Sequence, residues 1–200
     1  STGGQRTCIG YQAGKSNTGV SNTFIGRAAG SASSNGGTNV IVGSNSMAFA
    51  AIGSSNVAVG VQTGQSATGN YNSLLGHQAA QYLTSGSNNT ALGFEAGRNI
   101  TTGGNNVVIG YQAMDANTDG NDNGAIGYQA LEQETSGYRN TAIGRRALYA
   151  QNQTFAASNV AVGYGADDAN LTGFHRTCIG TQTGATGQGP SGGNITNIGY

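Results

Sequence analysis

A short phrase returns along this chain at a nearly constant interval, and each return is centred on a glycine. One copy is Asn106-Val107-Val108-Ile109-Gly110-Tyr111-Gln112-Ala113. The twelve glycines are Gly10, Gly26, Gly43, Gly60, Gly76, Gly93, Gly110, Gly127, Gly144, Gly163, Gly180 and Gly199, separated by 16 to 19 residues and most often by 17. A fixed period of this length marks a solenoid, in which each repeat is one turn of a coil. We therefore predict an all-β solenoid of about twelve rungs, each of ~17 residues.

The residues just before each glycine form the apolar part of the repeat. With the glycine as position 0, position −1 is Ile, Val or Leu in every copy, and position −2 is apolar in all copies but the last. Position −3 is mostly Thr or Val. Successive side chains of a strand point to opposite faces, and a strand with one wet face alternates apolar with polar residues. We therefore predict that both faces of this strand are buried.

A coil of this period is thin, with two or three short strands per turn. Its interior has room for little more than one row of Ile, Val or Leu side chains. A second apolar row then faces outward as a continuous stripe, which soluble monomers avoid. Association with further copies of the same chain buries such a stripe. The pattern leaves assemblies of two copies and of three copies both open.

Two other positions also repeat. Position +3 is Ala, Ser or Thr from Ala13 to Thr183, which predicts a narrow corner where stacked rungs admit only small side chains. Position −4 is asparagine in nine copies: Asn22, Asn39, Asn56, Asn72, Asn89, Asn106, Asn123, Asn140 and Asn159. Asparagine tolerates turn conformations and bonds to nearby backbone. Stacked asparagines can also pair their amides from rung to rung.

Composition excludes several classes of partner. The 200 residues carry eight basic and eight acidic side chains, so the formal net charge is zero and no nucleic-acid partner is expected. No apolar run approaches the roughly 18 residues of a membrane span, so we expect no membrane insertion of this segment. No composition break divides the chain, and residues 1–200 are predicted to form a single domain. Because the sequence lacks an initiator methionine and ends within a repeat, we expect it to be a fragment of a longer protein.

The two cysteines occupy position −2 near opposite ends of the chain. Cys8 and Cys178 lie in the matching phrases Arg6-Thr7-Cys8-Ile9-Gly10 and Arg176-Thr177-Cys178-Ile179-Gly180. Rungs spaced by about 4.8 Å separate them by roughly 50 Å, whereas a disulfide needs Cα atoms within about 7 Å. We predict two separate, small, buried thiols.

The phrases Asn140-Thr141-Ala142-Ile143-Gly144 and Ala125-Ile126-Gly127-Tyr128-Gln129-Ala130-Leu131 resemble the YadA-like head repeats of trimeric autotransporter adhesins. They are also similar to repeats of phage and viral tail fibres. The resemblance covers nearly the whole chain, although this repeat is longer than that of the adhesin heads. It implies a left-handed parallel β-roll packed as a homotrimer. It also implies an extracellular place, on a virion fibre or a bacterial cell surface, and a task of attachment.

Signals for catalysis or cofactors are scarce. There is no phosphate-binding loop, zinc-ligand spacing or nucleophile elbow, and we predict no enzymatic activity and no cofactor. The string Asp115-Ala116-Asn117-Thr118-Asp119-Gly120 resembles the first half of a calcium loop, but the twelfth position is Ile126 instead of Glu. Asp115, Asn117 and Asp119 are therefore a weak metal candidate, and a solvated loop is the alternative.

The best candidate for ligand binding is a pair of columns that follow the glycine. Position +1 carries the rings of Tyr11, Phe94, Tyr111, Tyr128, Tyr164 and Tyr200, and position +2 carries the amides of Gln12, Gln62, Gln78, Gln112, Gln129 and Gln182. Ring faces beside hydrogen-bonding amides suit sugars. The alternative is that the rings only stabilise neighbouring rungs or pad an interface between chains.

These features predict a structural and adhesive fibre segment, a rigid trimeric rod that attaches to host cells or surfaces. Its expected partners are further copies of itself and a host-surface glycan or protein receptor. One alternative is an ice- or surface-binding solenoid. That function needs an outward array of threonines, and the mixture of Thr with Val at position −3 suggests burial instead. Another alternative is a carbohydrate-binding fibre tip. A polysaccharide-active enzyme needs clustered carboxylates, and only eight acidic residues are present.

Overall fold

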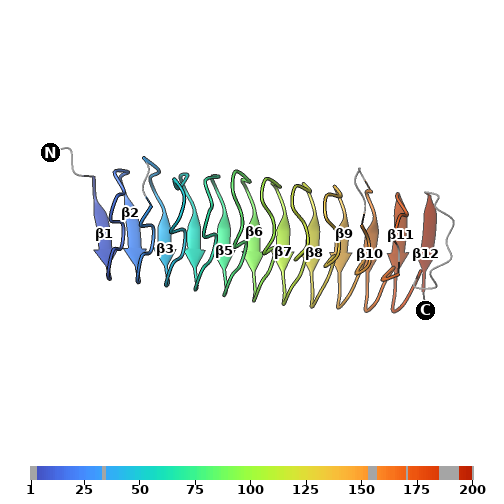
Figure 1. Ribbon diagram of the computed structural model, residues 1–200. Helices are drawn as coiled ribbons and strands as arrows, with labels where there is room; N and C mark the ends of the chain where they lie inside the picture. The colour runs from blue at the N-terminus through green and yellow to red at the C-terminus, as the bar shows by residue number, and fades with distance from the viewer. Residues whose placement is uncertain (1–3, 33–34, 153–156, 170, 185–193, 200) are drawn as a thin grey trace.

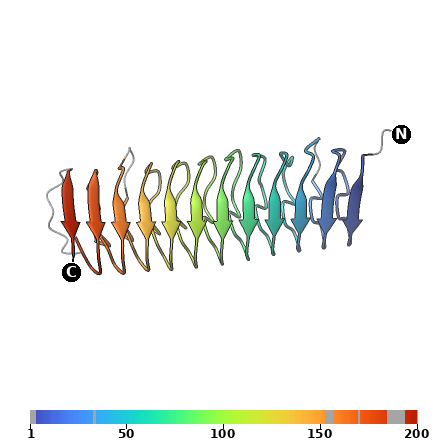
Figure 2. The ribbon, with the colours of Figure 1, turned by 180° about the vertical axis from the view of Figure 1, so that it is seen from behind.

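The computed structural model describes residues 4–32, 35–152, 157–169, 171–184 and 194–199. This part of the chain contains twelve short strands and no helix. The strands are β1 (Arg6–Ile9), β2 (Asn22–Ile25), β3 (Val40–Val42), β4 (Val57–Val59), β5 (Ser73–Leu75), β6 (Thr90–Leu92), β7 (Val107–Ile109), β8 (Gly124–Ile126), β9 (Thr141–Ile143), β10 (Val160–Val162), β11 (Arg176–Ile179) and β12 (Ile195–Ile198). They form one parallel sheet in chain order, drawn out as a rod (Figure 1) that Figure 2 shows from behind. The predicted β-solenoid is confirmed.

Equivalent positions of neighbouring repeats lie directly beside one another. In the pairing of β7 with β8, Val108 faces Ala125 and Ile109 faces Ile126. Each turn contributes one strand, so the prediction of two or three strands per turn is wrong. The return path is built from tight turns, yet its backbone hydrogen bonds still run from rung to rung. The Gln112 nitrogen, for example, donates to the Phe94 oxygen at 3.0 Å.

The recurring glycine marks the point where the strand ends and the chain turns. Gly110 has a φ of 137°, a conformation that L side chains rarely adopt. A Cβ on Gly110 would lie 2.3 Å from the backbone oxygen of Gly127 in the next rung. Both backbone conformation and close stacking therefore require glycine here.

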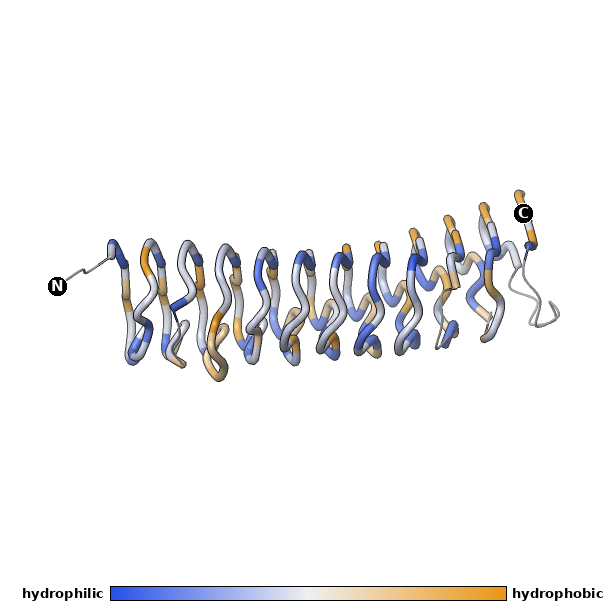
Figure 3. The backbone as a smooth tube through the Cα atoms, turned by 90° about the horizontal axis from the view of Figure 1, so that it is seen from above, coloured by the Kyte–Doolittle hydropathy of each residue, from blue (hydrophilic) through white to orange (hydrophobic). Residues whose placement is uncertain are grey.

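The row of side chains that fills the interior is position −2, whereas the Ile, Val and Leu row at position −1 was expected there. Val108, at position −2, is fully buried, whereas Val107 at position −3 is 42% exposed. Ile126, at position −1, is 37% exposed. The prediction that the uniform Ile, Val and Leu row fills the coil is therefore wrong, and the variable −2 row lies inside. The buried return path supplies the remaining core residues, including Met114, Leu131 and Leu148 at position +4. Figure 3 shows hydrophobic colour recurring along successive turns.

Side-chain volumes inside the coil compensate one another. Phe24 is the largest −2 residue and is completely buried. A Cβ on Gly30 would lie 2.5 Å from the Phe24 ring, so the glycine makes room for that ring. The small corner at position +3 is confirmed, since Ala96, Ala113 and Ala130 are all fully buried. Interior fit thus depends on matched residues in the same and adjacent turns.

The cysteines meet different environments. Both are free thiols, as predicted, but only Cys178 is buried. Cys8 is exposed because it lies on β1, which forms one edge of the sheet. Burial is the main cause that raises the pKa of the Cys178 thiol, and the nearby Asp167 carboxylate adds to it.

Candidate functional site

The first functional surface is the outer face of the sheet, which we define as positions −3 and −1 of β1 to β12. Every side chain at these positions is uncharged. Ten large aliphatic residues on it are between 37% and 74% exposed: Ile9, Val40, Val57, Leu75, Leu92, Val107, Ile126, Ile143, Ile179 and Ile198. A shallow hollow lies on this face between Val57, Leu75 and Leu92, where Ser73 supplies a smaller side chain than its neighbours. The −1 row of the outer face is therefore a continuous apolar stripe along the rod, beside a −3 row in which Thr and Val predominate.

The second surface is the ring column at position +1. His77, Phe94, Tyr111 and Tyr128 stack in sequence, with centroids 5.2 to 5.3 Å apart and planes within 9° of parallel. The guanidinium of Arg145 continues the stack, 5.4 Å from the ring centres of both Tyr128 and Tyr164. Within the stack the ring faces cover one another, so the edges and hydroxyls are what the column presents outward.

The remaining predicted ring residues lie outside this stack. Tyr11 is 70% exposed, and its hydroxyl accepts a hydrogen bond from Gln12 at 3.3 Å. Tyr200 lies outside the described residues. The structure therefore gathers Phe94, Tyr111, Tyr128 and Tyr164 into one column and leaves Tyr11 apart.

The amide column at position +2 is also a hydrogen-bonded ladder. Gln78 donates to Gln62 at 3.0 Å. The Gln112 amide donates to Glu95 Oε2 at 2.8 Å, and Gln129 donates to Gln112 Oε1 at 3.5 Å. The two columns are thus brought side by side as predicted, but much of their bonding capacity is used between rungs. Their role in ligand binding stays a prediction.

Two of the three residues of the weak metal candidate, Asn117 and Asp119, make other hydrogen bonds. Asn117 is fully buried, and its Oδ1 accepts a hydrogen bond from the Gly120 nitrogen at 3.1 Å. Asp119 lies on the exposed loop, where it accepts from Thr118 at 3.4 Å. Across the part of the chain that is described, no three His, Cys, Asp or Glu side chains gather as metal ligands.

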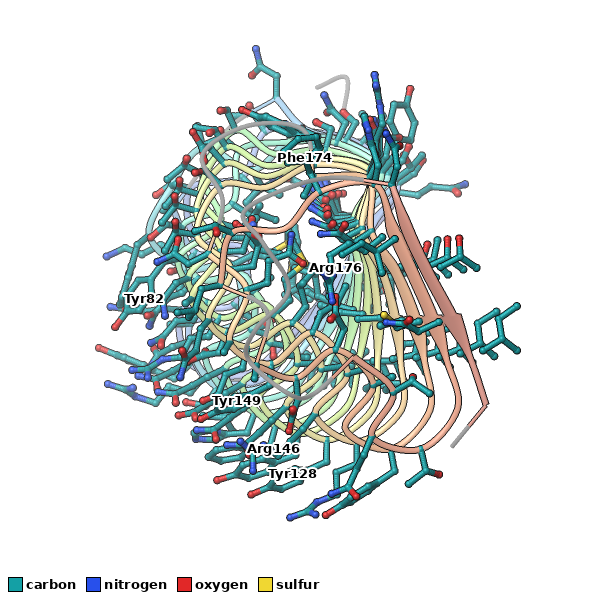
Figure 4. All side chains as sticks on the ribbon, turned by 90° about the vertical axis from the view of Figure 1, so that its right-hand side faces the viewer. Tyr82, Tyr128, Arg146, Tyr149, Phe174 and Arg176 are labelled. Carbon is teal, nitrogen blue, oxygen red and sulfur yellow. The ribbon has the colours of Figure 1, made fainter. Side chains whose placement is uncertain are left out.

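A third surface, which the sequence did not reveal, lies on the return path after β6 to β9. We call it the side patch and define it as Glu95, Arg98, Asp115, Glu132, Arg146 and Tyr149. Arg98 lies 3.5 Å from Glu95, and Arg146 lies over the Tyr149 ring at 4.2 Å from its centre. Figure 4 shows Arg146 and Tyr149 projecting from the rod on a different side from the sheet, with Tyr82 on the same flank.

Two carboxyl groups of the side patch, those of Asp115 and Glu132, have raised pKa values. Burial, aided by the Glu95 charge, raises the pKa of Asp115 to about 6, although Arg98 opposes the shift and Glu132 adds to it. Burial also raises the pKa of Glu132, against the Tyr149 hydrogen bond and the Arg146 charge. The available sequence signal was that Glu95, Asp115 and Glu132, three of the eight acids, fall in three consecutive repeats.

No protein-family model, curated protein or solved structure matches this chain significantly. Among the described residues there is likewise no helix long and apolar enough to cross a membrane.

Proposed function

We propose that this chain is a segment of a rigid fibre, in which three copies pack through the outer face and present their other surfaces for attachment to a host cell or surface. The observation that carries the proposal is the uncharged outer face, whose −1 row is Ile, Val or Leu in all twelve strands. Soluble monomers seldom expose an apolar surface of this extent. Burying it in a closed assembly removes it from water.

A second copy of the chain is the occupant that best fits this face. Any partner that covers the whole face must match twelve rungs at strand spacing, which is about 4.8 Å. Another copy has the same period because it has the same sequence, and its own outer face must also be covered. Closed symmetry then allows every copy to be covered at once.

Three copies are favoured over two by the shape of the apolar surface. It does not stop at the flat face but continues past the glycine turn into the ring column, where Phe94, Tyr111 and Tyr128 are 41% to 43% exposed. A surface that turns a corner suits packing around a three-fold axis, since flat two-fold packing leaves one side uncovered. The left-handed coil, the trimer, and the extracellular role in attachment follow the resemblance to adhesin heads and tail fibres.

The oligomeric mass tests this proposal. Light scattering of the purified chain should give about three times its mass of 20.0 kDa. Ile126→Glu and Leu92→Glu place a charge on the outer face and should lower the mass. Gln133→Glu adds the same charge at an exposed turn residue and should leave it unchanged. A monomeric wild-type chain, or outer-face variants that keep the wild-type mass, would overturn the proposal.

An ice-binding function is the second candidate, because the outer face of the single chain carries threonines. In the single chain position −3 lies on the outer face, where it carries Thr7, Thr23, Thr90, Thr141, Thr177 and Thr196. The array is irregular, however, because Val40, Val57, Ser73, Val107, Gly124 and Val160 occupy the same column in the other strands. Thermal hysteresis distinguishes the two functions. We expect none above that of an inert protein at equal concentration.

A further inference from the structure

The return path carries aromatic residues at a second position, +6, where they are interrupted by a small residue. Phe49, Ser66 and Tyr82 occupy this position in three successive turns. The backbones of Phe49 and Tyr82 are equivalent, because each nitrogen donates to the +5 oxygen of the following turn at 3.0 Å. Two rings are therefore placed two rungs apart with a serine between them. We call these three residues the +6 cluster.

Both rings of the +6 cluster are accessible from solvent. Phe49 is 65% exposed and Tyr82 is 43% exposed, and Ser66 between them is half-buried. Figure 4 shows Tyr82 on a different side of the rod from the sheet. Packing of further copies on the outer face therefore leaves the +6 cluster open to a ligand.

One face of the Tyr82 ring is covered by the protein, and the opposite face is directed at Ser66. The Arg98 guanidinium lies over the ring, 5.5 Å from its centre. Gln81 accepts a hydrogen bond from Arg98 at 3.2 Å, and Glu95 forms an ion pair with it at 3.5 Å, so the arginine is held in place. Because Arg98 belongs to the following turn, the other ring face looks back toward the turn that carries Ser66.

The spacing of the +6 cluster suits one further ring between Phe49 and Tyr82. In the ring column, rings of neighbouring turns stack with their centres 5.2 Å apart. Equivalent positions two turns apart are therefore separated by about 10 Å. The side chain of Ser66 is too short to fill that distance. A ligand ring above Ser66 would meet a protein ring on each side at the separation this rod already uses for stacking.

The chemistry around the +6 cluster indicates what kind of ring it takes. No Asp, Glu, Lys or Arg occurs between Arg27 and Glu95, so this section of the rod offers no charged partner. The negative face of an aromatic ring attracts weakly positive C–H groups, which both faces of a pyranose ring present. The Ser66 hydroxyl can donate to and accept from sugar hydroxyls. A puckered pyranose is also thicker than a flat aromatic ring, which suits the long spacing.

We propose that the +6 cluster binds one pyranose ring of an uncharged saccharide, stacked between Phe49 and Tyr82 and hydrogen-bonded to Ser66. The proposal names a receptor class for the attachment role, and it rests on that role for its biological meaning. The contacts themselves do not involve the outer face. Saccharide binding and oligomeric mass therefore succeed or fail separately.

The test is binding of the labelled full chain to an array of neutral oligosaccharides built from glucose, galactose, mannose or N-acetylglucosamine. Uronic-acid oligosaccharides and immobilised tyramine, which offers a flat aromatic ring, are placed on the same array. The best neutral probe is then titrated by calorimetry. Phe49→Ala and Tyr82→Ala each remove one stacking face and should weaken binding by roughly tenfold.

Ser66→Tyr tests the same site without removing any contact of the fold. It places a protein ring where the ligand ring would lie, and the rod already accepts rings at this position in both adjacent turns. Binding of the neutral probe should be lost, while the melting temperature stays at or above that of the wild type.

Tyr71→Ala is the matched control, because it removes a ring that is 64% exposed but lies at position −5, outside the +6 cluster. It should bind like the wild type, and all variants should keep the wild-type oligomeric mass. Binding of no neutral probe, binding of uronic-acid or tyramine spots alone, or wild-type affinity of Ser66→Tyr would overturn the proposal. None of these results changes the oligomeric mass, so the fibre proposal is judged independently.

Discussion

Asn123 donates two hydrogen bonds to the side-chain oxygen of Asn106, from its backbone nitrogen at 2.9 Å and from its side-chain amide at 3.2 Å. The same amide also donates to the Gly137 oxygen at 2.8 Å. Backbone bonds of this kind continue without a break from Asn22 to the nitrogen of Arg176. The asparagine column is therefore a buried ladder that ties each rung to the next.

Loss of one asparagine should weaken the rod at that rung. Asn106→Ala leaves the Asn123 nitrogen and the Gly120 oxygen without side-chain partners in a buried place. We expect a loss of about 2–4 kcal/mol, since each unsatisfied group costs about 1–3 kcal/mol. Denaturant unfolding followed by circular dichroism measures it. Gln133→Ala, which truncates an exposed amide, should change stability by less than about 0.5 kcal/mol. Equal stability of both variants would contradict a stabilising ladder.

At one rung near the C-terminal end, a buried ion pair takes the place of the asparagine side chain. Arg176 stands where other rungs have asparagine, and Asp167 stands where others have Leu131 or Leu148. Arg176 donates two hydrogen bonds to Asp167, at 2.6 and 2.8 Å, and both side chains are at most 5% exposed. The bonds to Asp167 raise the pKa of Arg176.

Removing one partner of that ion pair should cost far more stability than replacing both partners. Asp167→Ala leaves a buried guanidinium unpaired and should lower the free energy of unfolding by about 3–5 kcal/mol. The double variant Asp167→Leu with Arg176→Asn restores the residues of neighbouring rungs and should recover most of that loss. Melting temperatures of the two variants decide the matter, and a double variant as unstable as the single one would refute the explanation.

The ring column should contribute to stability whether or not it binds a ligand. Tyr111 stacks on both Phe94 and Tyr128, and each aromatic pair is worth about 0.5–1.5 kcal/mol beyond buried area. Tyr111→Ala combined with Tyr128→Ala should therefore destabilise the rod by at least about 1 kcal/mol. The same variant tests the predicted ligand role: if the still-folded rod binds cells or glycans as well as the wild type, the ring column is not the binding site.

Asp115 should make stability depend on pH. Its ordinary pKa of 3.8 is raised to about 6 in the folded chain, so folding favours the protonated form. The stability linked to this proton is fully present below about pH 4 and is lost as the pH rises through 6. Melting temperature should therefore fall between pH 4 and pH 7 more steeply for the wild type than for Asp115→Asn. Parallel curves for the two proteins would contradict the raised pKa.

Much of the fold follows directly from the order of residues. The glycine period gives the number of repeats, because a chain that repeats every 17 residues must return to the same place in each turn. The small corner at Ala113 and the stacking of Asn106 on its neighbours follow for the same reason. Gly110 and its equivalents are recognisable as turns because only glycine allows the close approach of the next rung.

The candidate sites were predicted less completely. The ring and amide columns were found because Tyr111 and Tyr128, like Gln112 and Gln129, repeat in kind at a fixed position. The side patch was missed because Asp115, Glu132 and Tyr149 share a position but not a residue type. Periodicity detects repeated residues, whereas a site built from different residues becomes visible only when their turns are stacked.

The sequence by itself determined the parallel coil, its register and the two apolar rows of each strand. Only the tertiary structure decided which row lies inside. Uniform residues such as Ile109 and Ile126 make an even outer face, whereas a row that varies from Ala91 to Phe24 must fit cavities that other turns leave. Volume compensation between Phe24 and Gly30 depends on contacts across the coil, and no pattern along one strand contains that information.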